Sequence, residues 1–105
     1  MLLATSDKIE GKIISETLGI VKGETVQSKH VGKDFMAGMK TLVGGEIKGY
    51  TQMISEARKI ATERMIEEAK ALGADAVVGV RYGSSEAMQG CAEMLAYGTA
   101  VKLEK

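Results

Sequence analysis

The sequence predicts an α+β domain in which one short and one long helix cover one face of a mainly antiparallel sheet. Two observations carry this prediction: a long amphipathic helix that ends at a glycine, and two apolar strands that follow it. The chain has 105 residues, of which 45% are hydrophobic, so it can bury one small core. We therefore expect a single domain over residues 1–105.

The long helix is predicted from about Tyr50 to Leu72. At about 100° per residue, its apolar side chains fall on one arc and most of its charged side chains fall on the other. Gly73 directly follows the periodic segment and is the expected C-terminal stop.

Three residues depart from the helical pattern. Arg64 and Glu68 lie four residues apart inside the apolar arc, and Ile66 lies on the charged side. One interpretation places the charged pair at the rim of the core, with the side chains reaching out to water. The alternative is a helix with two buried contacts, one to its own sheet and one to a neighbouring subunit. In that case Ile66 would be an interface residue.

The short helix is predicted over residues 35–43, with Asp34 as its N-cap and Gly44 and Gly45 ending it. Residues 2–5 could form a short edge strand. Residues 18–27 are predicted to form a second early strand, in which Gly19 and Gly23 indicate a bulge or a close backbone approach.

Residues 75–83 and 91–103 are predicted to form the two final strands, joined as a hairpin by a loop over residues 84–90. A hairpin centred on Ala87 would place Arg81 opposite Glu93 and Val77 opposite Tyr97. The crossover from the early strand could make one pairing in the sheet parallel.

The last strand has an unusual composition. Residues 94–101 carry no charge, with larger side chains at the odd positions and mostly small ones at the even positions. A strand of this kind is expected to be packed on both faces. A chain of this size has few layers to supply two covers, so the pattern favours self-association.

Composition narrows the classes of function. Charges balance at 14 basic and 14 acidic residues, and there are three Tyr, one Phe and no Trp, so nucleic-acid binding is not expected. No segment is long and apolar enough to span a membrane, and the N-terminus does not resemble a signal peptide. We expect a cytoplasmic protein.

Metal binding is weakly indicated. Met88, Cys91 and Met94 are spaced three apart and offer soft sulfur ligands. Three-residue spacing converges on a helix but diverges on a strand, where Cys91 points away from the two methionines. His30, the single histidine, is expected to be a surface residue. We therefore expect no metal or other cofactor within one chain, although a ring could bring copies of one ligand together.

Polar residues near the predicted packed surfaces are candidates for binding. They are Glu46, Tyr50, Arg58, Arg81 and Glu93. They could form structural ion pairs or a ligand-binding cluster. No catalytic triad is recognisable, so no catalytic residue is assigned.

Several segments together resemble the YbjQ-like family, a group of uncharacterised proteins often labelled as heavy-metal-binding. These segments are residues 19–24, 34–38, 44–46 with Tyr50, 57–58 with Ala61, 73–81 and 96–101. The resemblance implies a dodecin-like fold and homo-pentameric rings in which short extra strands help to join subunits. It implies no catalytic residues.

The expected function follows from these observations. We expect a non-enzymatic homo-oligomer that binds a small ligand at its subunit interfaces. The alternatives are a heavy-metal-binding protein and, less favoured, an enzyme with a site between subunits.

Overall fold

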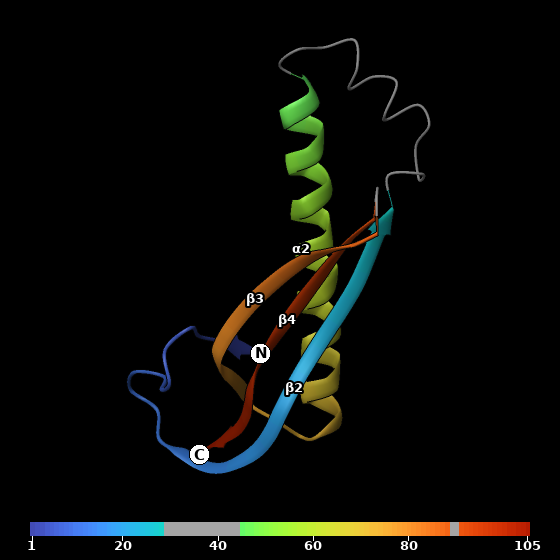
Figure 1. Cartoon of the computed structure of the whole chain (residues 1–105). Helices are drawn as coiled ribbons and strands as arrows, with labels where there is room; N and C mark the ends of the chain where they lie inside the picture. Colours follow the sequence, from blue (N-terminus) through green and yellow to red (C-terminus); the bar gives the residue numbers. More distant parts are fainter. Residues whose placement is uncertain (29–44, 89–90) are drawn as a thin grey trace.

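The computed structural model describes residues 1–28, 45–88 and 91–105. Its elements are β1 (Leu2–Leu3), β2 (Ile14–Ser28), α2 (Gly45–Ala71), β3 (Ala76–Met88) and β4 (Cys91–Leu103). The strands form one sheet in the order β1-β3-β4-β2 (Figure 1). The α+β class is confirmed. The helix predicted over residues 35–43 lies outside the described residues.

The sheet is mixed, which corrects the prediction of a mainly antiparallel one. β4 pairs antiparallel with both β2 and β3, whereas β1 pairs parallel with β3. The parallel pairing arises because the chain crosses over between β1 and β3 and re-enters the sheet in the same direction. The possibility that the crossover makes one pairing parallel is thus realised.

The helix stop at Gly73 is confirmed. Gly73 has a φ of 80°, a left-handed conformation that glycine adopts without strain. The Ala74 N–H donates to the Ala69 carbonyl at 3.1 Å, and the Gly73 N–H donates to the Lys70 carbonyl at 2.9 Å. These bonds form a Schellman motif, which turns the chain sharply from α2 into β3.

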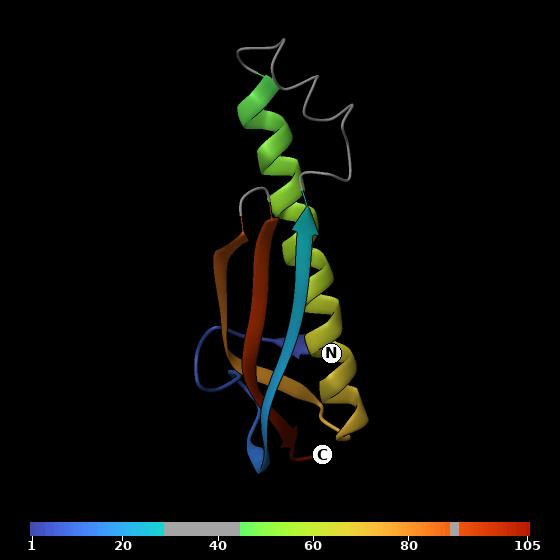
Figure 2. The same ribbon diagram turned by 45° about the vertical axis from the view of Figure 1, so that its right-hand side comes forward.

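The long helix lies along one face of the sheet (Figure 2) and packs on it through small side chains. Every fourth residue from Ala57 to Ala69 is buried, with Met65 as the one large member. Opposite them, the even positions of β4 from Met94 to Ala100 are buried as well. The small face predicted for the last strand therefore receives the helix at close range.

The N-terminal segment covers the other face of the sheet near the C-terminal end of β4. There, Ile9 and Ile14 pack on a second small cluster formed by Ala76, Val78 and Val101. The last strand is thus covered on both faces towards its C-terminal end. Towards its N-terminal end, no described element of the chain covers the second face of β4.

The hairpin register differs from the prediction. β3 continues to Met88, so residues predicted as loop belong to a strand. Arg81 pairs with Tyr97 rather than Glu93, and Glu93 pairs with Ser85. The physical reason is a longer hairpin combined with a register shift between Val78 and Arg81, where Gly79 adopts a φ of 63°.

Candidate functional site

Two of the predicted site residues, Arg81 and Glu93, lie on the sheet face that points away from α2. They do not pair, because Glu93 lies four positions along β4 from Tyr97, the partner of Arg81, a spacing of about 13 Å. Arg81 instead donates from Nη1 to the carbonyl oxygen of Thr5 at 2.8 Å. Arg81 therefore holds the N-terminal segment in place and does not form an ion pair with Glu93.

The other three predicted site residues lie on α2. The main chains of Glu46 and Tyr50 belong to this helix, but their side chains lie outside the described part of the structure. Arg58 is exposed, and α2 lies on the opposite side of the sheet from Arg81. Arg58 and Arg81 therefore cannot converge on one ligand within a single copy.

The described residues do not fit a heavy-metal centre within one chain. No three His, Cys, Asp or Glu side chains among them lie close enough to hold an ion. Met94 is buried in the apolar core beneath α2, among aliphatic side chains. Met88 and Cys91 pair across the end of the hairpin, and their side chains are not part of the described structure.

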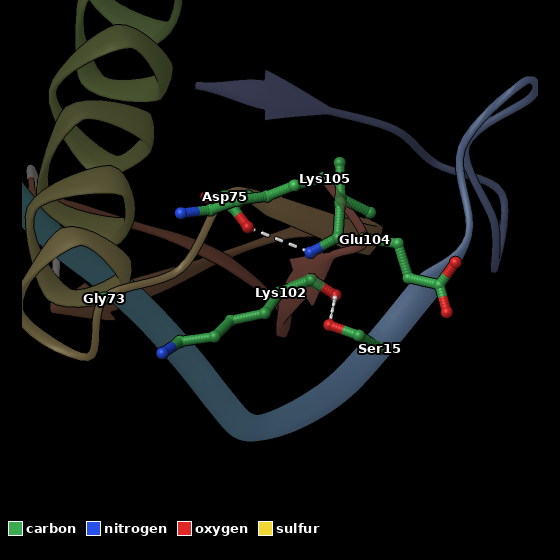
Figure 3. Close-up of a pocket in the computed structure, with 7 residues that line it drawn as sticks. Ser15, Gly73, Asp75, Lys102, Glu104 and Lys105 are labelled. Atoms are coloured by element: carbon green, nitrogen blue, oxygen red, sulfur yellow. Dashed lines mark hydrogen bonds between the residues drawn. The ribbon is translucent and has the colours of Figure 1, made fainter.

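A depression of about 470 Å³ lies at the end of the molecule where α2 stops (Figure 3). Its lining comes from β2, from the turn after α2 and from the C-terminal end of β4: Ser15, Gly73, Asp75, Lys102, Leu103, Glu104 and Lys105. No chemical motif in the sequence indicates this group of residues. The Gly73-Ala74-Asp75 turn was the one available signal for it.

The polar groups of this depression mainly hold the chain together. Asp75 Oδ2 accepts the Leu103 N–H at 2.9 Å, and the Ser15 hydroxyl donates to the Lys102 carbonyl at 3.3 Å (Figure 3). The Lys102 side chain lies beside Gly73 at the C-terminal end of α2, where the helix dipole favours a cation. This arrangement ties the ends of β2 and β4 to the turn after the helix.

Three of the exposed apolar side chains of the sheet lie on the face away from α2. Ile20 is 80% exposed, Val26 is 56% exposed and Tyr97 is 40% exposed. We call this surface the open face, formed by the following residues of β2 and β4: Ile20, Lys22, Glu24, Val26, Leu95 and Tyr97.

An ion pair lies on the open face, along the edge strand β2. Lys22 Nζ lies 3.0 Å from Glu24 Oε1, and the pair runs along β2 between the two exposed aliphatic residues. The hydrogen bond and the charge of Glu24 raise the pKa of Lys22 above its ordinary value. Both side chains are exposed, so the pair contributes little to the stability of an isolated copy.

Arg64 and Glu68, the residues that interrupt the helical pattern, reach the outer edge of β2. Arg64 Nη1 donates to the Glu24 carbonyl at 2.6 Å, and Glu68 Oε1 accepts the Lys22 N–H at 3.3 Å. Both residues are exposed at the rim of the core, as one of the two interpretations predicted. Their contact with the backbone of an edge strand is a role that the sequence did not reveal.

α2 leaves β3 largely uncovered, because it packs mainly on β2 and β4. One side-chain hydrogen bond joins the flank of the helix to β3, between Thr62 Oγ1 and the Tyr82 hydroxyl at 2.9 Å. Tyr82 remains 43% exposed despite this bond. No pattern in the sequence indicates this contact of Tyr82.

Comparison with known proteins identifies the family. A family model described as "Putative heavy-metal-binding" matches residues 1–104. A UPF0145 protein of Clostridium novyi is 62% identical over 103 residues, which cover 98% of this chain and 99% of the relative. A UPF0145 protein of Thermotoga petrophila is 62% identical over 105 residues, with 100% and 99% covered. The chain belongs to the YbjQ-like family.

This membership confirms the resemblance seen in the sequence segments. A protein of unknown function from Pediococcus pentosaceus, which belongs to the DUF74 family, has a similar fold in its crystal structure. Its TM-score is 0.63 at 17% identity, with 99% of this chain and 98% of that chain covered. No helix within the described residues is long and apolar enough to cross a membrane.

Proposed function

We propose that this YbjQ-like protein acts as a non-enzymatic homo-oligomer, a pentameric ring as the family resemblance implies, that binds a small ligand where its subunits meet. The observation that carries the proposal is the open face. Exposed aliphatic side chains and a tyrosine line a sheet surface that no described element of the same copy covers. A surface of this kind on a small domain is typical of a protein interface.

The apolar side chains of the open face support association. Ile20 and Val26 are exposed on it, beside the exposed Tyr97 ring. Exposed apolar side chains gathered on one surface of a small domain are typical of an interface between proteins.

The charges around the open face favour a small polar ligand. Lys22 and Glu24 form an ion pair on it, and Arg81 and Glu93 lie on the same side of the sheet. Clefts between subunits that contain both signs of charge and the Tyr97 ring could bind a molecule with a flat apolar part and a charged group. We favour binding over catalysis, because Arg58 and Arg81 lie on opposite sides of the sheet.

The oligomeric state tests this proposal. We expect light scattering after size exclusion to give a mass several times 11.2 kDa at micromolar concentration. Ile20→Lys would place a charge on the open face and lower that mass. Ile13→Lys is a matched control, since Ile13 is 64% exposed but precedes β2 and is not part of the open face. A wild-type mass of one chain at every concentration would refute the proposal.

Heavy-metal binding is the second candidate, and the description of the family favours it. The described residues of one copy do not supply a set of ligands, so a metal would have to be shared between copies. Dialysis against Cu(I), Zn(II) and Ni(II), followed by elemental analysis of the intact oligomer, separates the two candidates. A whole-number ratio of metal to ring would favour metal binding.

A further inference from the structure

We propose that Arg81 and Tyr97, neighbours on the sheet face away from α2, form a binding site for a small aromatic anion. The ring of the ligand stacks on Tyr97, and its carboxylate or phosphate group binds to Arg81. The proposal rests on the proposed function and deepens it, because it names the chemical class of the ligand and the two side chains that select it. The site lies within one copy of the chain, so it can be tested separately from the oligomeric state.

The strand register places a cation directly beside the tyrosine ring. Arg81 pairs with Tyr97 across β3 and β4, and Tyr97 pairs with Lys22 across β4 and β2. Side chains directly opposite one another on adjacent strands share a face of the sheet, with Cβ atoms about 5 Å apart. One row across the sheet therefore carries a guanidinium, an aromatic ring and an ammonium group.

The surface beside the ring has room for a flat molecule. Tyr97 is 40% exposed. Gly83 lies two positions after Arg81 on the same face, and a Cβ added there would meet no heavy atom within 4 Å. Leu95, the partner of Gly83, is half-buried and lies two positions before Tyr97. An aromatic ligand can therefore lie over Gly83 and Leu95 with its ring offset against that of Tyr97.

Arg81 is held in position by the main chain. Its Nη1 donates to the Thr5 carbonyl at 2.8 Å and to the Val80 carbonyl at 2.9 Å. A guanidinium has more N–H donors than these two bonds use. Within the described part of the chain, no carboxylate forms an ion pair with Arg81. A guanidinium that is already fixed and has donors to spare is suited to a carboxylate or phosphate, which it binds through parallel N–H bonds.

The surrounding charges favour an anion over a cation. Lys22 and Glu24 neutralise each other at 3.0 Å, and they lie on β2, two strands and about 10 Å from β3. Glu93 lies four positions along β4 from Tyr97, about 13 Å away. The charge next to the ring without a described counter-ion is thus that of Arg81. An aromatic anion complements this charge, whereas an aromatic amine would place two cations together.

Two naphthalene compounds test the sign of the charge on the wild-type chain. 2-Naphthoate and 2-naphthylmethylamine carry the same ring with opposite charges, and acetate carries the carboxylate alone. Amide chemical shifts of the deuterated, nitrogen-15-labelled chain are followed during titration at neutral pH. We expect 2-naphthoate to bind at least about tenfold more tightly than either other compound, with the largest shifts at Gly83, Leu95 and Tyr97. Equal affinity for the two naphthalene compounds, or shifts confined to other residues, would overturn the proposal.

Variants of Arg81 test the contribution of its charge. Arg81→Gln should weaken the binding of 2-naphthoate at least about tenfold and leave that of 2-naphthylmethylamine no weaker, whereas a general disturbance of the surface would weaken both. Arg58→Gln is the matched control, since Arg58 is exposed on α2, on the opposite side of the sheet. It should leave both affinities unchanged. An Arg81→Gln chain that binds 2-naphthoate as tightly as wild type contradicts the proposal.

Variants of Tyr97 test the contribution of the ring. Tyr97→Leu removes the aromatic face and should weaken the binding of 2-naphthoate about fivefold. Tyr97→Phe keeps the ring and removes only the hydroxyl, so its affinity should match that of wild type. If Tyr97→Leu binds as tightly as Tyr97→Phe, stacking on Tyr97 is wrong.

The oligomeric state distinguishes a failure of this inference from a failure of the proposed function. An oligomer that shows no preference for 2-naphthoate would overturn the aromatic-anion site and leave the proposed assembly intact. A chain that is monomeric at every concentration and still prefers 2-naphthoate would refute the proposed assembly and support the site.

Discussion

Replacing Gly23 with alanine tests the way in which α2 and the sheet fit together. A Cβ at Gly23 would overlap the Ala61 carbonyl oxygen and the Met65 nitrogen, and it would lie 2.9 Å from the Arg64 Cβ. Two of these three atoms belong to helix backbone, so no rotation of a side chain can remove the overlap. The helix would have to move away from β2 as a body.

The size of the effect follows from that movement. Ordinary contact begins at 3.4 Å, so the Arg64 Cβ alone requires a shift of about half an ångström, and the overlapped backbone atoms require more. Moving α2 outward loosens the contacts of its buried alanines with β4. Overpacking typically costs about 1–3 kcal/mol. Because backbone blocks the site, we expect a loss of about 3 kcal/mol, or a fall in Tm on the order of 10–20 °C.

Gly83→Ala is the matched control. Gly83 lies in β3 with no heavy atom within 4 Å of an added Cβ, and its φ is not positive. We expect this variant to remain within about 0.5 kcal/mol of wild type. Thermal unfolding followed by circular dichroism at one fixed chain concentration measures both variants. If Gly23→Ala unfolds at the same temperature as Gly83→Ala, the close approach of helix and strand described above is wrong.

Three further predictions concern the edge, the ion pair and metal. Combining Arg64→Ala with Glu68→Ala should expose the β2 edge and produce aggregates larger than the wild-type oligomer in sedimentation; an unchanged profile would contradict an edge-closing role. Lys22→Gln should lower Tm slightly at neutral pH. Because the pKa of Lys22 is raised in the folded state, its contribution is present below 10.5 and is lost as the pH rises through the raised value, so the difference in Tm should vanish in strong base. A difference in Tm that persists in strong base would show that the effect comes from the aliphatic part of the Lys22 side chain and not from its charge. Finally, elemental analysis after dialysis should find less than one metal ion per copy of the proposed ring, because the described residues of one chain offer no set of ligands.

The end of the long helix and the bounds of the last strand could be predicted from the sequence. The periodicity of residues 50–72 and the glycine after them are local signals, and the helix ends where these signals place its end. Cys91–Leu103 forms a strand with the predicted bounds. Gly19 marks a register shift and Gly23 a close approach, the two roles that strand glycines indicate.

The candidate site was much less predictable. Arg81 and Glu93 were expected to pair, but their separation depends on the hairpin register, which a shift near Gly79 changes. The polar stretch after Gly83 was expected to be a loop, yet it pairs with β4. Polar residues are acceptable in a strand whose side chains are exposed, and exposure is not visible in the order of the residues.

The sequence by itself determined the family, the α+β class and the small-residue face of the last strand, because each depends on residue identity or on short-range periodicity. The tertiary structure alone decided that Arg64 and Glu68 bond to the edge of β2, whereas no described strand lies beside β3 above Val80. That difference arises because α2 lies over β2 and β4 and hardly over β3. The position of a helix across a sheet is set by contacts between residues far apart in the chain, such as Gly23 with Ala61, and no local pattern encodes it.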